Sequence, residues 1–243
     1  MTLFITSSPF LEGADRALLS SANGFLDRIR QALPPTPRAL FVCSDPNDHE
    51  MTCQFGAETM AAFARARIPF SAYQVLDGEN AGDAAELIAR ADFIILAGGH
   101  VPTQNAFFQD IGLGELLREF PGTIMGISAG SMNLAEEVYI QPEEEGESSP
   151  DFVRFAPGLG LTDVNILPHY QKVKDFWLDG QRLFEDITYA DSFGRMFFVL
   201  PDGSYFYQDE DQLLLIGESW VIQDGEIHPL LHNGEILNLD EWN

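Results

Sequence analysis

The chain has 243 residues, 45% of them hydrophobic, which is enough to bury one core, and we expect a single α/β domain over residues 1–243. Its 38 acidic residues outnumber 13 basic ones and give a formal net charge of −25, so nucleic acid and anionic membranes are not expected partners. No apolar run is long enough for a membrane helix and the first residues lack a signal-peptide pattern, so we expect a cytoplasmic protein.

The only cysteines are Cys43 and Cys53, too few for a disulfide framework. We interpret both as ordinary thiols. The sequence has no clustered Cys/His site and no phosphate-binding loop, so we expect neither a metal nor a cofactor.

The first hundred residues alternate short apolar runs with segments of helical periodicity. Strands are predicted at 3–6, 39–43, 70–76 and 93–97, and helices at 14–33, 50–66 and 81–91. This alternation predicts a doubly wound, mainly parallel sheet with helices on both faces, that is, three layers. Ligands are then expected beyond the carboxyl ends of the strands.

The segment 123–132, TIMGISAGSM, has the pattern of a strand that turns sharply into a helix with a serine at the turn. Ser128 is therefore a candidate nucleophile. The backbone N–H of Ala129 would point to the position of a substrate oxyanion, and the following helix would add its positive N-terminal end. In the alternative interpretation, Ser128 only caps a helix and the glycines only permit close packing.

The preceding predicted strand ends at Gly98-Gly99-His100, and a glycine pair there lets a ligand approach the backbone closely. Gly99 is the second candidate oxyanion donor. A tight turn before the next helix is the alternative. His100 at the same rim is interpreted as a substrate or scaffold contact.

After the acidic segment 142–151, which is typical of a solvated loop, an apolar strand at 164–167 ends in Pro168-His169-Tyr170. His169 is the histidine best placed to act as a base for Ser128, although a histidine after a strand is often structural. The tail then contains short strands separated by turns, at 196–201, 204–208, 213–216 and 220–222. They predict antiparallel hairpins at one edge of the sheet.

Taken together, these residues resemble the peptidase E and cyanophycinase family of serine peptidases, which have the class I glutamine amidotransferase-like fold. The likeness rests on four segments in order, which are the strand running into Gly98-Gly99, the elbow GISAG with SMNLA after it, Pro168-His169, and LPDGS at 200–204. It implies Ser128 as nucleophile, His169 as base, and Gly99 with Ala129 as oxyanion donors. It also implies an acid between the serine and the histidine, for which Glu143 is our choice among Glu143, Glu144 and Glu145.

The resemblance implies an aspartyl dipeptidase acting on small acidic peptides, with hydrolysis of cyanophycin-type or isoaspartyl dipeptides as the alternative. Tyr170, in the PHY segment, is then a candidate substrate contact. Arg182 is the cation we expect to bind the substrate carboxylate, because a guanidinium can form two parallel hydrogen bonds. In the alternative, Arg182 lies on a surface helix over 178–187 and pairs with Glu185 or Asp186.

Two other functions stay open. An amidotransferase-like domain with glutaminase chemistry is disfavoured, because that chemistry normally uses cysteine at the elbow. A non-catalytic binding module that keeps the fold is the other. For the oligomeric state, a homodimer is the alternative to a monomer.

Overall fold

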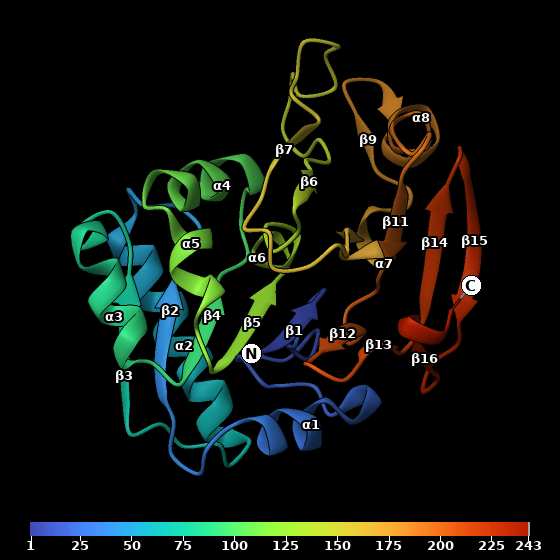
Figure 1. The fold of residues 1–243 in the computed structure, drawn as a ribbon. Coiled ribbons are helices and arrows are strands. Elements are labelled where there is room, and N and C mark those ends of the chain that lie inside the picture. The colour runs from blue at the N-terminus through green and yellow to red at the C-terminus, as the bar shows by residue number, and fades with distance from the viewer. Residues whose placement is uncertain (243) are drawn as a thin grey trace.

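The central element is an eight-stranded sheet (Figure 1). The computed structural model describes residues 1–242. The mutually parallel strands are β1 (Thr2–Thr6), β2 (Arg38–Val42), β3 (Ala72–Leu76), β4 (Phe93–Leu96) and β5 (Thr123–Ile127). They lie side by side in the order β1-β5-β4-β2-β3. Parallel neighbours need long crossover connections, and helices supply them here.

Helices cover both faces of this sheet because the strands β1, β5, β4 and β2 are apolar on both sides. In β4, Ile94 and Leu96 join the core under one face, and Phe93 and Ile95 join the core under the other. The first core includes α3 (Ala84–Arg90), α4 (Val101–Asp110) and α5 (Leu113–Arg118), and the second includes α1 (Phe25–Ala32) and α2 (His49–Arg65). The predicted three-layer, doubly wound sheet is confirmed.

Antiparallel strands from the C-terminal part extend the sheet beyond β1. β12 (Tyr205–Gln208) pairs with β1, and β13 (Leu213–Ile216) and β16 (Ile236–Asn238) follow. The predicted hairpins at one edge of the sheet are therefore present.

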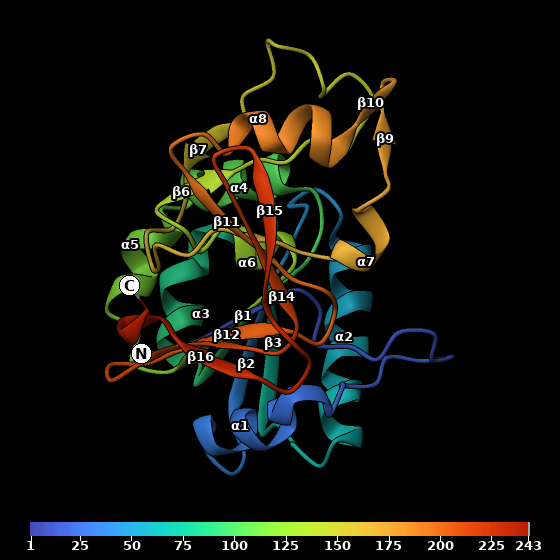
Figure 2. The ribbon, with the colours of Figure 1, turned by 90° about the vertical axis from the view of Figure 1, so that its right-hand side faces the viewer.

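The remaining tail strands form a second, smaller sheet above this edge (Figure 2). Its order is β15-β14-β11-β8, with β8 (Ile166–Leu167), β11 (Met196–Val199), β14 (Ser219–Gln223) and β15 (Glu226–Leu231). Buried residues of this sheet share a third core with Tyr139, Leu183 and Phe184. The second sheet thus carries the segment around His169 over the carboxyl ends of the parallel strands.

Short elements complete the upper part of the molecule. The helices are α6 (Ala129–Met132), α7 (Tyr170–Val173), a π-helical turn at Leu183–Thr188, and α8 (Tyr189–Asp191). The hairpins are β6 (Glu137–Tyr139) with β7 (Phe155–Pro157), and β9 (Trp177–Leu178) with β10 (Gln181–Arg182).

Two predicted helices differ from the structure. The helix expected over 14–33 begins only at Phe25, because Asn23 and Gly24 have φ of 54° and 71°, outside the right-handed helical region. The helix expected over 178–187 is instead the β9–β10 hairpin followed by the π-helical turn. Its turn is made by Asp179 and Gly180, with φ of 50° and 80°.

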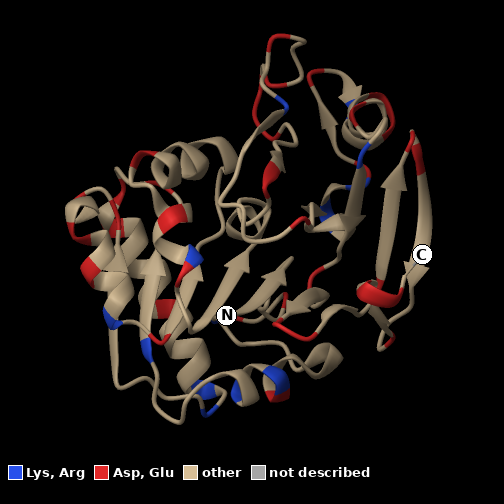
Figure 3. Cartoon of the chain, viewed as in Figure 1, with Lys and Arg blue, Asp and Glu red and all other residues tan. Residues whose placement is uncertain are grey.

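None of the helices within residues 1–242 is long and apolar enough to cross a membrane. Figure 3 shows the acidic residues, in red, distributed over helices, strands and loops, with far fewer basic residues, in blue, among them.

Candidate active site

Ser128 occupies the turn between β5 and α6 in a strained backbone conformation. Its φ of 51° and ψ of −113° lie where residues other than glycine are rare, at a cost of about 1–3 kcal/mol. The N–H of Ser128 donates to the carbonyl oxygens of Thr6 and Ser7, each at 3.1 Å, which anchors the turn to the end of β1. Such strain is the property expected of a nucleophile elbow.

The two glycines of GISAG are required by close packing. A Cβ atom on Gly126 would lie 2.6 Å from the backbone nitrogen of Ser131, and one on Gly130 would lie 2.4 Å from the carbonyl oxygen of Leu96. Both distances are shorter than any contact between real atoms of these kinds, so a side chain at either position would displace the turn or the end of β4. The sharp turn therefore depends on both glycines.

His169, the predicted base, lies beside Ser128. It follows β8 with a left-handed backbone, φ 59°, and its Nε2 is 2.9 Å from Oγ of Ser128. Its Nδ1 is 2.6 Å from Oδ1 of Asp202, so the hydrogen-bond network places the proton on Nδ1. Nε2 is then free to accept the hydroxyl proton of Ser128.

The carboxylate beside His169 belongs to Asp202, whereas we expected Glu143. Asp202 lies in the turn between β11 and β12, and its side chain is only 8% exposed. Burial alone would raise the pKa of Asp202, but hydrogen bonds from His169, Lys172 and Ser7 outweigh it and hold the pKa far below its usual range. The Lys172 ammonium is 2.7 Å from Oδ2 of Asp202.

Ser7 is a member of this network that the sequence did not reveal. Its hydroxyl donates to Oδ1 of Asp202 at 2.9 Å and accepts the backbone N–H of His169 at 2.8 Å. Ser7 is fully buried and comes directly after β1. The rule that ligands gather beyond the carboxyl ends of parallel strands is the signal that could have drawn attention to this position.

Gly99 and Ala129 flank the elbow at the ends of β4 and β5. In the described part of the chain, neither backbone N–H has a protein acceptor. A Cβ on Gly99 would lie 2.4 Å from Cβ of Ser44, so glycine is required there for packing. Because α6 has only four residues, its N-terminal end adds little positive potential at the elbow.

A pocket of about 200 Å³ opens between the elbow, the segment 141–143 and α7. It is lined by Ser128, Met132, Gln141, Pro142, Glu143, Pro168, His169, Val173, Phe176 and Leu183. Most of this wall is apolar, and among these lining residues Glu143 has the single carboxyl group. Loss of solvation, with the charges of Glu147 and Glu144, raises the pKa of Glu143 to about 7, although nearby His100 and His169 oppose the shift.

The sequence comparison decides the family. The pattern of peptidase family S51 matches residues 51–216, more than half of the chain. The chain belongs to peptidase family S51. The match contains Ser128, His169 and Asp202, and membership makes the chain a peptidase hydrolase of the serine class.

Among solved structures, the chain is similar to a 1.5 Å crystal structure of a candidate peptidase E protein from Listeria monocytogenes EGD-e. The TM-score is 0.59 at 16% identity, covering 95% of this chain and 98% of the other. At that identity the likeness concerns the fold. No curated protein matches the sequence.

In this S51 peptidase, the three predicted substrate contacts lie outside the wall of the pocket. Arg182 pairs with Asp186 through two contacts, at 2.7 and 3.1 Å. This is the alternative pairing considered above, although it forms across the start of the π-helical turn. The ring of Tyr170 packs on Trp220, with centroids 4.6 Å apart.

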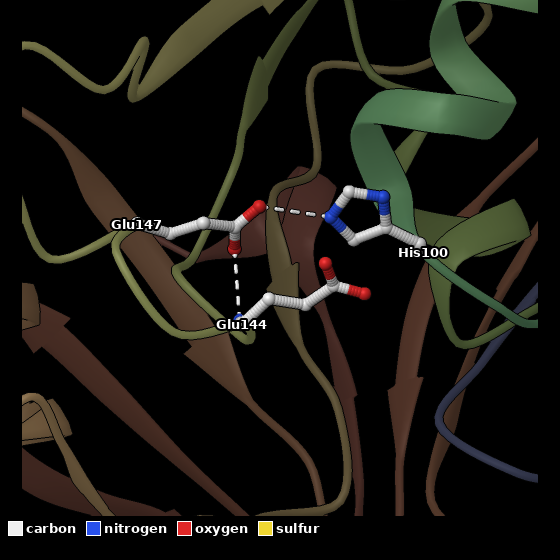
Figure 4. Close-up of side chains that lie close together, drawn as sticks. All are labelled: His100, Glu144 and Glu147. Atoms are coloured by element: carbon white, nitrogen blue, oxygen red, sulfur yellow. Dashed lines mark hydrogen bonds and ion pairs between the residues drawn. The ribbon is translucent and has the colours of Figure 1, made fainter.

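His100 is held by the acidic loop (Figure 4). Its Nε2 is 2.9 Å from Oε1 of Glu147, and its Nδ1 is 2.8 Å from the hydroxyl of Thr103. Glu147 also accepts the backbone N–H groups of Glu143 and Glu144. One possible metal-ligating atom from each of His100, Glu144 and Glu147 lies within 4.8 Å of the other two. These three side chains could together hold a metal ion, and the sequence did not predict this grouping.

Proposed function

We propose that the chain hydrolyses short peptides through a triad of Ser128, His169 and Asp202. The observation that carries this proposal is the continuous hydrogen-bond path from Oγ of Ser128, through both ring nitrogens of His169, to Asp202. A nucleophile, a base and a group that orients the base, all within hydrogen-bond reach, are the parts that serine acyl transfer requires.

In this mechanism, Nε2 of His169 removes the hydroxyl proton as Oγ of Ser128 attacks the peptide carbonyl. Asp202 keeps the imidazole in the correct tautomer and stabilises the imidazolium that forms. The N–H groups of Gly99 and Ala129 would bind the oxyanion of the tetrahedral intermediate. The imidazolium then protonates the leaving amine, and water activated by the same imidazole hydrolyses the acyl-enzyme.

The pocket supports substrates that are short and carry a free amino group. Its volume of about 200 Å³ is below the 300–1,000 Å³ typical of sites for drug-sized ligands. Glu143 offers a carboxylate to a cation, and the lining residues include no lysine or arginine to bind an acidic side chain. We therefore place the α-ammonium group of the substrate's first residue beside Glu143, which makes the enzyme a dipeptidase or short-chain aminopeptidase.

A fluorophosphonate probe tests the nucleophile, because only an activated serine reacts with it. Wild type should be labelled once, at Ser128, and Ser128→Ala not at all. Hydrolysis of a dipeptide library, with each peptide also supplied in an N-acetylated form, tests the substrate class. Loss of cleavage on acetylation is expected. Labelling of Ser128 with equal cleavage of both forms would retain the triad and reject the role of Glu143.

A further inference from the structure

A second group of interacting side chains lies at the edge of the sheet, away from Ser128. His49 and Cys53 are one turn apart near the start of α2, and Asp77 directly follows β3. β3 is three strands away from β5 in the sheet order, a separation of about 14 Å at the usual strand spacing. This group therefore does not share the pocket of the serine site.

The three side chains are arranged as a carboxylate, a base and a nucleophile in contact, which is the arrangement that activates a nucleophile. Oδ2 of Asp77 is 2.6 Å from Nδ1 of His49, and Nε2 of His49 is 3.4 Å from Sγ of Cys53. Asp77 is fully buried, and its other oxygen accepts the N–H of Glu79 at 3.0 Å, so the carboxylate is fixed. With its Nδ1–H donating to Asp77, the imidazole of His49 presents the lone pair of Nε2 to the thiol.

The site is accessible to small reagents. The His49 side chain is 44% exposed and Cys53 is half-buried. The other cysteine, Cys43, is fully buried, and burial together with the charges of Asp77 and Asp45 raises its pKa to about 12. Only one of the two thiols thus has both access to solvent and a neighbouring base, which are the conditions for a reactive cysteine.

We infer that Cys53 is a thiol-modification site that exchanges with low-molecular-weight disulfides. His49 accepts the thiol proton on Nε2, and the thiolate attacks one sulfur of the disulfide. A new S–S bond to Cys53 forms while the original S–S bond breaks, and the departing thiolate takes the proton from His49. Cys53 is oxidised to the mixed disulfide, and one half of the reagent is reduced to a free thiol.

The charges around the thiol favour a cationic reagent. Glu79 lies 3.6 Å from Nδ1 of His49, and Asp48 and Glu50 flank the histidine in the chain. These carboxylates, on a chain of net charge −25, attract positive disulfides and repel anionic ones. Cystamine should therefore react faster than oxidised glutathione.

The test treats the intact protein with each disulfide at pH 7 and locates the adduct by peptide mass spectrometry. We expect one adduct, on Cys53, formed faster with cystamine. Cys43→Ser should leave the rate unchanged, and Cys53→Ser should abolish the adduct. Since a free thiol is only a few per cent ionised at this pH, His49→Gln should slow the reaction by about ten- to thirtyfold.

Ser128→Ala should leave the rate at Cys53 unchanged, which keeps this inference separate from the proposed peptidase mechanism. His49 is exposed, so His49→Gln should keep the wild-type circular dichroism spectrum. A folded His49→Gln protein that reacts as fast as wild type would overturn the inference. So would a wild-type rate no greater than that of a short unfolded peptide containing Cys53.

Discussion

Asp202 lies 2.6 Å from Nδ1 of His169, although it is 33 residues further along the chain and on a separate turn. Asp202→Asn keeps the size of the side chain but favours the wrong imidazole tautomer. We expect kcat to fall by about 10⁴-fold, the loss seen for this change in Ser-His-Asp triads. Steady-state kinetics on a cleaved dipeptide measures it.

The same experiment separates Asp202 from the acid expected by resemblance. Glu143→Gln, Glu144→Gln and Glu145→Gln are the matched controls, since each removes one carboxylate near the pocket. All three should keep a kcat far above that of Asp202→Asn. If kcat instead fell by about 10⁴-fold in Glu143→Gln and stayed near the wild-type value in Asp202→Asn, Glu143 would be the triad acid.

Ser128 and His169 should behave as one unit. Ser128→Ala and His169→Ala are each expected to lower kcat by about 10⁴- to 10⁶-fold, and the double variant should be little worse than either. The reason is that the base has no proton to accept once the hydroxyl is gone. Multiplicative losses in the double variant would show that the two residues act independently.

The sequence predicted the layers and the elbow because those features are local. Hydrophobic periodicity determined the parallel strands, and GISAG determined the position of Ser128. The partner of His169 was not local. Asp202 was part of the LPDGS segment already quoted for the resemblance, but nothing in its neighbours showed that the second sheet brings this turn back to His169. Three adjacent glutamates in an acidic loop offered a stronger but misleading signal.

Ser7 forms hydrogen bonds to both Asp202 and the backbone of His169. Its substitution tests whether these two hydrogen bonds affect catalysis. Ser7→Ala removes one hydrogen bond to a carboxylate and one from the His169 backbone, interactions worth about 1.5–3 kcal/mol when a charged group takes part. We expect kcat to fall by about ten- to a hundredfold with KM nearly unchanged. Ser7→Thr should recover much of the loss, and an unaltered kcat in Ser7→Ala would make Ser7 purely structural.

Glu143 should give the enzyme a pH response near neutrality. Its pKa is raised to about 7, so its ionised fraction, and with it binding of a substrate ammonium, increases as the pH rises through that value. Asp202 has the opposite shift and stays ionised throughout, so it adds no step in this range. The kcat/KM profile of Glu143→Gln should lose the step near pH 7.

The raised pKa of Glu143 also makes the stability of the fold depend on pH. Protonation favours the folded state, so the stabilisation is complete below the unfolded pKa of about 4.3 and is lost as the pH rises through about 7. Glu143→Gln should therefore be more stable than wild type above neutral pH, by an amount reduced because the side chain still contacts solvent. Chemical denaturation at pH 5 and pH 8.5 measures the difference.

Arg182 should be dispensable for substrate selection. It binds Asp186 instead of facing the pocket, and Val173, Phe176 and Leu183 line the wall on that side. Arg182→Met should change kcat/KM by less than about twofold on both Asp-Xaa and neutral dipeptides, since exposed ion pairs contribute little. Arg118→Met is the matched control, because Arg118 makes a similar exposed pair with Glu115, away from the pocket. If Arg182→Met alone selectively loses activity on Asp-Xaa dipeptides, the guanidinium must leave Asp186 to bind substrate.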